Sequence, residues 1–136
     1  MDSTANKPLP HCRAILLCED IDEDAGTLSL HKLIESFKLP SFPGPTGPFA
    51  AFLRLYDGIG RYPMSIEVNA LDNDTSVAIA TLADLDFPVR LARIDVVIPV
   101  DFVHLPRAGP YELIVLVDRR ELAREYFDAE LDHDRE

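Results

Sequence analysis

Apolar and polar residues alternate strictly over several short segments of the chain. In the segment 90–103, every second residue falls on an apolar face, and the opposite face carries charged residues and Pro99. The segments 49–56 and 62–70 alternate in the same way, whereas 111–117 is apolar on both faces. A period of two is typical of half-buried strands, and a short continuous apolar run is typical of strands covered on both sides. These segments therefore predict β-strands.

Further strands are predicted near the start and in the middle of the chain. Arg13–Asp20 is apolar on both faces, which indicates a strand in the centre of a sheet. A shorter strand is predicted at Val77–Leu82. Between the first strand and the next segment, residues 19–26 predict an acidic turn, closed by Gly26 with a positive φ.

Two segments fit either a helix or a strand. In Leu28–Leu39, four apolar residues from Leu30 to Phe37 have the i, i+3, i+4, i+7 spacing of a helix, whereas the surrounding segments favour a strand. Glu121–Leu131 also contains both a helical stripe and an alternation, and here we favour a strand with an irregular start.

Together these segments predict an all-β protein, namely an antiparallel β-sandwich of about eight strands, immunoglobulin-like or C2-like. Residues 11–131 are expected to form this single domain, with a flexible N-terminal tail at 1–10 and a charged C-terminal tail at 132–136. The residues expected in the core are Leu16, Cys18, Leu53, Ile66, Val68, Ile98, Val100, Leu113 and Val115.

The charge balance of the 136 residues excludes some classes of partner. The chain has 24 acidic and 13 basic side chains and a net charge of −11. Nucleic-acid binders need a surplus of Lys and Arg, and an anionic membrane repels an acidic protein. No apolar stretch approaches the ~20 residues of a membrane span. We therefore expect neither a nucleic-acid nor a membrane partner.

The two cysteines indicate a reducing compartment. Along one strand, the Cα atoms of Cys12 and Cys18 would be roughly 20 Å apart. A disulfide needs a Cα separation below about 7 Å. Free thiols are typical of intracellular proteins, and we expect a cytoplasmic location.

The strand predicted within Arg90–Val103 has the features of a sheet edge. Pro99 cannot donate a backbone hydrogen bond, and Arg93, Asp95 and Asp101 add charges on the same face. Prolines and charges keep an edge from pairing with another chain. Any self-association should therefore use another surface.

Acidic residues form the most notable candidate site. Asp20, Asp22 and Asp24 are spaced like the first ligands of a calcium loop, but Ala25 and His31 stand where that loop needs Gly and Glu. In a sandwich with about eight strands, the turn at 20–26 would meet three other connections at one end. The calcium candidates collected in this way are Asp20, Asp22, Asp24, Asp57, Asp86 and Asp118. A solvated acidic rim is the simpler interpretation, so we assign no metal ligand and no cofactor.

The sequence contains no recognisable catalytic motif. The four histidines are far apart, and neither a Gly-x-Ser-x-Gly elbow nor a phosphate-binding loop occurs. We therefore expect a non-enzymatic protein, a binding or assembly module for an unknown protein partner or for a second copy. Its candidate contact surfaces are the Pro-rich loop 40–48, the acidic end and an edge strand. The alternative is a calcium- or ligand-responsive β-sandwich that uses acidic loops at one end.

Several short motifs follow one another in an order typical of one family. They are Ala14-Ile15-Leu16-Leu17-Cys18-Glu19-Asp20, Gly26-Thr27-Leu28-Ser29-Leu30, Ser41-Phe42-Pro43, Gly60-Arg61-Tyr62 with Asp72, and Gly109-Pro110-Tyr111. This order resembles an uncharacterised bacterial family of short cytoplasmic proteins with a domain of unknown function. The resemblance spans nearly the whole chain. It implies a β-sandwich and a strand at Leu28–Leu39, and it supplies no activity and no catalytic residue.

Overall fold

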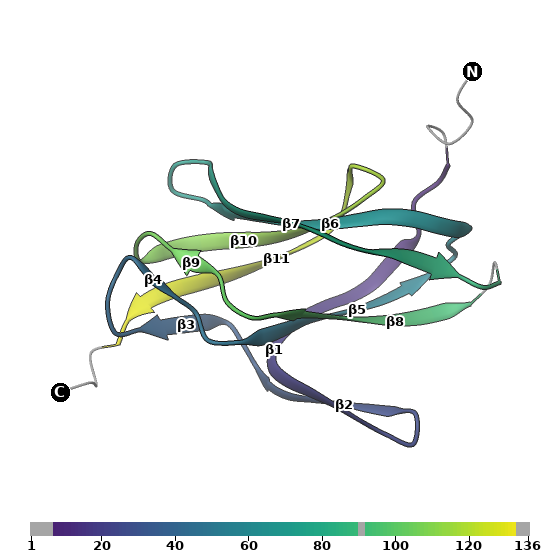
Figure 1. Ribbon diagram of the computed structural model, residues 1–136, viewed down its shortest axis with the longest axis horizontal. Coiled ribbons are helices and arrows are strands. Elements are labelled where there is room, and N and C mark those ends of the chain that lie inside the picture. Colours follow the sequence, from purple (N-terminus) through teal and green to yellow (C-terminus); the bar gives the residue numbers. More distant parts are fainter. Residues whose placement is uncertain (1–6, 90–91, 133–136) are drawn as a thin grey trace.

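The computed structural model describes residues 7–89 and 92–132, and every regular element in them is a β-strand (Figure 1). The predicted tails 1–10 and 132–136 lie partly outside the described residues, as do the first two residues of the segment 90–103. The strands are β1 (His11–Asp24), β2 (Thr27–Leu33), β3 (Ser36–Leu39), β4 (Gly44–Pro45), β5 (Phe49–Tyr56), β6 (Gly60–Ala70), β7 (Thr75–Phe87), β8 (Arg93–Val100), β9 (His104–Leu105), β10 (Gly109–Val117) and β11 (Arg120–Leu131).

The strands form two main sheets that face each other. The four-stranded sheet has the order β2-β1-β5-β8, and the five-stranded sheet has the order β3-β11-β10-β6-β7. Figure 1 shows them as two layers, with β6, β7, β10 and β11 above β1, β5 and β8. β3 and β11 are parallel, and the other pairs are antiparallel. The predicted all-β fold is confirmed, as is its largely antiparallel sandwich arrangement.

Most of the predicted core residues are buried between the sheets or within a sheet. The prediction is confirmed for Cys18, Leu53, Ile66, Val68, Ile98, Leu113 and Val115, and it is wrong for Leu16 and Val100, which are half-buried. Leu17 takes the inner position of β1, with 2% of its surface exposed, because both faces of this strand are apolar and sequence parity does not distinguish them. Val100 ends an edge strand. Phe102 is the last residue on the apolar face predicted for the segment 90–103. It lies beyond β8 and is 60% exposed.

The segment Leu28–Leu39 forms two strands that belong to different sheets. β2 pairs with β1, whereas β3 runs parallel to β11. Lys32 has a φ of 60°, and the chain then crosses between the layers through Ile34 and Glu35, which hydrogen-bond the backbones of β1 and β11. Of the two alternatives, the strand is the one observed, and it is divided into β2 and β3. Glu121–Leu131 is also confirmed as a strand, and a bulge at Leu122 accounts for its irregular start.

Strand β1 changes its partner at Cys18. Residues 11–18 pair with β5, and residues 18–24 pair with β2. Glu19–Leu33 therefore projects from the sandwich as a two-stranded ribbon, the arm, whose strands leave the lower layer in Figure 1. The acidic turn predicted at 19–26 is wrong because most of it is strand. Only Ala25 and Gly26 turn, with φ values of 51° and 82°, so the positive φ of Gly26 is confirmed.

The described N-terminal residues lie against the end of the sandwich where β1 begins. The hydroxyl of Tyr62 donates to the carbonyl of Pro8 at 2.9 Å, and Nη2 of Arg120 donates to the carbonyl of Lys7 at 2.6 Å. Pro10 is buried. These contacts connect the approach to β1 with β6 and β11.

Candidate binding edge on strand β7

The three aspartates of the arm share one face. Asp20, Asp22 and Asp24 alternate along β1 opposite His31, Ser29 and Thr27 of β2. Nε2 of His31 lies 2.8 Å from a carboxylate oxygen of Asp22, and both side chains are exposed. The opposite face of the arm carries the half-buried Ile21, Leu28 and Leu30.

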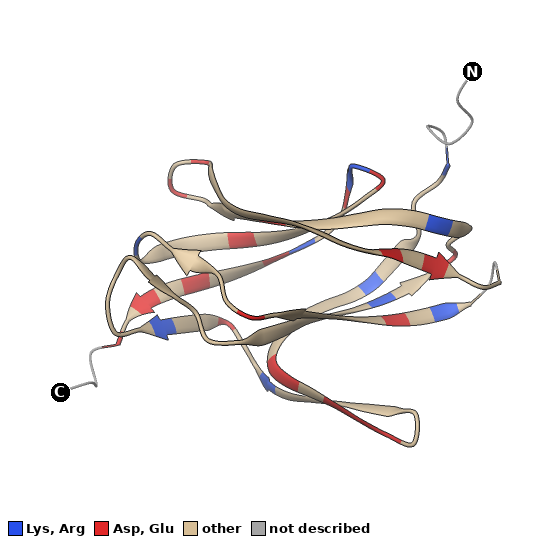
Figure 2. Ribbon diagram, in the orientation of Figure 1, with Lys and Arg blue, Asp and Glu red and all other residues tan. Residues whose placement is uncertain are grey.

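The other three calcium candidates lie away from the arm. Asp57 follows β5 beside the start of β1, Asp86 pairs with Arg61, and Asp118 is in the turn after β10. The register of β1 separates them from Asp20, Asp22 and Asp24, because the arm begins where pairing with β5 ends. Figure 2 shows acidic residues along the arm and, apart from them, near the end of β7. Among residues 7–89 and 92–132, no three His, Cys, Asp or Glu side chains are arranged to hold a metal ion.

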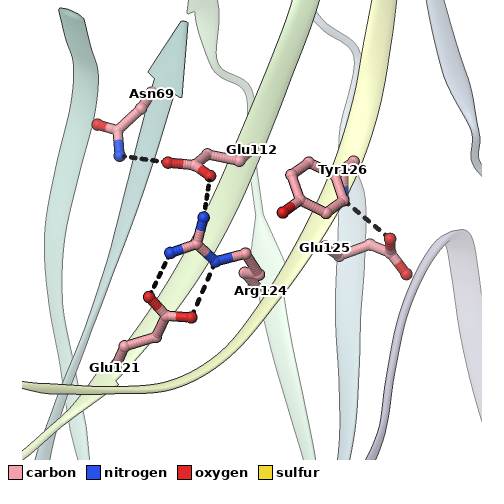
Figure 3. A network of polar contacts seen from close by, with 6 residues as sticks. All are labelled: Asn69, Glu112, Glu121, Arg124, Glu125 and Tyr126. Atoms are coloured by element: carbon pink, nitrogen blue, oxygen red, sulfur yellow. Dashed lines mark hydrogen bonds and ion pairs between the residues drawn. The ribbon is translucent and has the colours of Figure 1, made fainter. Parts of the chain in front are cut away.

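A polar network covers the outer face of the five-stranded sheet (Figure 3). Glu112 of β10 is only 7% exposed. Its two carboxylate oxygens accept hydrogen bonds from Nη1 of Arg124 at 2.7 Å and from Nδ2 of Asn69 at 3.1 Å. Arg124 also donates Nε to Glu121 at 2.8 Å, and this contact lowers the pKa of Glu121. Each charged group already has its partner, so the network favours a structural role.

Sequence reasoning missed Glu112 as a buried charge. Its only signal was one acidic residue within the apolar run 111–117. Burial depends on the register that brings Asn69 and Arg124 from the two neighbouring strands, and a single sequence does not show that register.

Two further ion pairs connect elements that lie far apart in the sequence. Arg54 of β5 donates Nε and Nη2 to Asp95 of β8 at 2.8 and 3.0 Å. Arg107 binds Asp72 in the same two-pronged way, at 3.1 and 2.7 Å. Hydrogen bonds from the arginines lower the pKa values of Asp95 and Asp72. Within the described residues, every buried side-chain N or O atom has a hydrogen-bond partner.

The cysteines do not form a reactive centre. Cys12 and Cys18 are free, and Cys18 is fully buried. Burial raises the pKa of both thiols, which lowers the fraction present as the nucleophilic thiolate. The prediction that Cys18 is a small buried residue is confirmed.

Because these polar side chains are paired within the fold, the backbones at the sheet edges are stronger candidates for contact. Three of the edge strands carry features that oppose pairing with another chain. β8, the predicted edge, is confirmed in that position and contains Pro99. β2 contains Lys32 with its positive φ, and β3 has only 4 residues, one of them Lys38.

The fourth edge strand, β7, lacks these features along most of its length. It has 13 residues, and its first part, Thr75–Ala83, contains no charged residue and no proline. Ile79 is 70% exposed, and Ala80 and Thr81 beside it are exposed as well. Val, Ile and Thr are strong strand formers. The sequence predicted only Val77–Leu82 as a strand here, and it did not predict an edge.

A groove of about 470 Å³ opens between β7 and β8, the two edge strands on the same side of the sandwich. The side chains of Met64, Leu85 and Ile98 in the groove are buried. Leu82, Ile94 and Val96 also line it and are half-buried. The groove therefore gives access to inward-facing apolar side chains beside an unpaired strand.

Solved structures with a similar fold come from several proteins. One is the Pseudomonas fluorescens alkylpurine DNA glycosylase AlkC bound to DNA with an abasic site analogue, with 10% identity and a TM-score of 0.50. The match covers 71% of this chain but only 27% of the glycosylase chain, so this chain corresponds to a small part of that protein. An immunoglobulin-like protein from Pseudomonas aeruginosa has 12% identity and a TM-score of 0.47, over 91% of this chain and 98% of that one. The CARDB domain of a Pyrococcus furiosus protein, in complex with di-metal ions, has 13% identity and a TM-score of 0.41, over 97% and 98%. At these identities the likeness concerns the fold alone.

Sequence comparison gives one family match. The model of a family of unknown function, DUF6941, matches residues 13–129. This confirms the expected resemblance to an uncharacterised family at that level. No curated protein has a matching sequence. In the described part of the chain, no helix is long and apolar enough to cross a membrane.

Proposed function

This chain belongs to the DUF6941 family, a family of unknown function, and we propose that it is a non-catalytic binding module that takes up an extended segment of a partner protein along β7. The observation that carries the proposal is the contrast between the edges. β8, β2 and β3 carry proline, lysine or a positive φ, whereas Thr75–Ala83 of β7 presents an unpaired backbone with none of these three features, interrupted by a bulge at Val77.

An extended segment beside β7 would satisfy both the backbone and the groove. Its N–H and C=O groups would pair with the free edge, which is the source of affinity in strand addition. Ala78, Ala80 and Leu82 pair with Val68, Ile66 and Met64, whose side chains are buried, so they lie on the inner face of the sheet. Alternate side chains of the segment would point to the same inner side, and those beside Leu82 would reach the groove between β7 and β8.

Several charged side chains already have partners within the fold, which supports a role without catalysis. Glu112, Arg124, Asp95 and Asp72 are each engaged within the fold, and both cysteines have raised pKa values. The resemblance of the sequence and its two separated free cysteines support a bacterial cytoplasm as the place of action.

Selection of displayed random peptides tests the proposal. The selected peptides should have apolar residues at alternate positions and should protect β7 amides from hydrogen exchange. They should fail on Ala80→Glu, because this change places a charge on the inner face beside the groove. Ser29→Glu adds the same charge on the exposed arm and should bind like the unmodified protein.

Three results would contradict the proposal. They are the absence of enriched sequences, equal binding to Ala80→Glu, and exchange protection at another surface. Thermal melts of both variants would confirm that each remains folded, since both positions are exposed.

A further inference from the structure

We propose that the occupant of β7 is a basic segment, with an uncharged, β-branched centre and Lys or Arg at both ends, and that it is not a second copy of this chain. This inference rests on the proposed function and adds the chemistry of the partner.

The charges around β7 are predominantly acidic. Asp74 precedes the strand and is exposed, and Asp84 and Asp86 follow its uncharged part. Glu67 of β6 pairs with Ile79 at the centre of the outer face. β7 itself contains no basic residue. Near its C-terminal end, Asp86 pairs with a basic residue, Arg61 of β6.

Other nearby charges do not change this balance. Across the groove, Asp95 is held by Arg54, and Arg93 begins β8. Asp72 is engaged by Arg107. The exposed carboxylates of Asp74 and Asp84 therefore remain the groups that flank the uncharged stretch.

The same residues disfavour self-pairing. In an antiparallel pair of two β7 strands, the acidic later part of one strand, with Asp84 and Asp86, lies near the turn residue Asp74 that precedes β7 in the second copy. Like charges brought close together across a strand pair destabilise it. The net charge of −11 adds general repulsion between copies.

Spacing defines the complementary segment. Ten positions separate Asp74 from Asp84, but β7 is bulged at two places, so the ten steps of β7 from Thr75 to Leu85 face only eight steps of β6, from Ala70 to Tyr62. A segment with two basic residues about eight positions apart would therefore place one near each carboxylate. Uncharged residues between them would pair along Thr75–Ala83.

Three blocked nine-residue peptides test this inference. All have alternating Val and Thr in the seven central positions, and their two end residues are Lys, Gln or Glu. Fluorescence anisotropy should show that the Lys-ended peptide binds roughly tenfold more tightly than the Gln-ended one, the effect of two exposed ion pairs. The Glu-ended peptide should bind most weakly. Because salt screens exposed charges, these differences should largely disappear at 1 M NaCl.

A matched pair of double variants locates the effect. Asp74→Asn with Asp84→Asn should weaken the Lys-ended peptide to the level of the Gln-ended one and leave the latter unchanged. Asp22→Asn with Asp24→Asn removes the same charge from the arm and should leave all three affinities unchanged.

Each alternative result has a distinct meaning. Equal binding of the three peptides would overturn the basic occupant and leave strand addition intact. Binding by none of them would count against the proposed function itself. A dimer in light scattering that dissociates in Ala80→Glu would identify a second copy as the occupant and overturn the inference.

Discussion

Shortening Leu113 to alanine should remove a large part of the protein's stability. Leu113 has 0% of its surface exposed and lies on β10, between β11 and β6. The change removes three carbons, and at about 0.8 kcal/mol per buried CH₂ the lost transfer free energy is about 2.4 kcal/mol. Because strands flank β10 on both sides, the cavity left by the missing carbons cannot close fully. The free-energy cost of this cavity should raise the total loss of stability to about 3–4 kcal/mol. This is a substantial fraction of a typical unfolding free energy of about 5–15 kcal/mol.

Ile98→Ala provides the matched control because it also removes three carbons. Ile98 is 3% exposed, but it lies on the edge strand β8 and lines the open groove. Water and neighbouring side chains can enter the space there, so we expect a smaller loss of about 2–3 kcal/mol. Urea unfolding monitored by circular dichroism should show lower midpoints with an unchanged slope. A loss below about 1 kcal/mol for Leu113→Ala, or a larger loss for Ile98→Ala, would refute this packing argument.

Three further predictions concern the ionisable groups. Arg54 lowers the pKa of Asp95, so their ion pair stabilises the fold at pH values above the unfolded pKa of about 3.9. This stabilisation is lost as the pH falls through the pKa that Asp95 has in the folded protein. The melting temperature of Asp95→Asn should therefore lie below that of the unmodified protein at pH 7, and the two should be equal in strong acid. Cys18 should react with a thiol reagent at pH 8 only as fast as the protein opens, since it is buried and its pKa is raised, and immediate labelling of the folded protein would contradict its placement. Calcium should leave the melting temperature unchanged, with or without Asp22→Asn and Asp24→Asn, whereas a calcium-dependent rise that is lost in this variant would identify a metal site.

The sequence predicted the strands with clear alternation because burial on one face is a local property. The inner faces of β6 and β8 follow the apolar positions of 62–70 and of 94–98, and Pro99 correctly indicated an edge. The assignment was less secure on β1. There Leu16 and Leu17 are equally apolar, and only the facing sheet selects Leu17.

Long-range pairing explains what the sequence could not predict. Leu28–Leu39 changes sheets because the backbones of β1 and β11 are available to Ile34 and Glu35. The uncharged stretch of β7 is not distinctive in itself, since the still longer uncharged run Pro40–Leu53 includes the first five residues of the central strand β5. Only the strand order identifies β7 as an edge and thereby as the candidate site.

The parallel pair of β3 with β11 has a consequence for synthesis on the ribosome. Ser36 hydrogen-bonds Glu130 from a position 94 residues earlier in the chain. At about 5–20 residues per second, roughly 5–20 s pass between the synthesis of these two residues. During that interval β3 has no partner strand, and β10, once it is made, lacks its partner β11. The five-stranded layer can close only when β11 emerges, so nascent chains of this protein should depend on protection from aggregation until β11 has been synthesised.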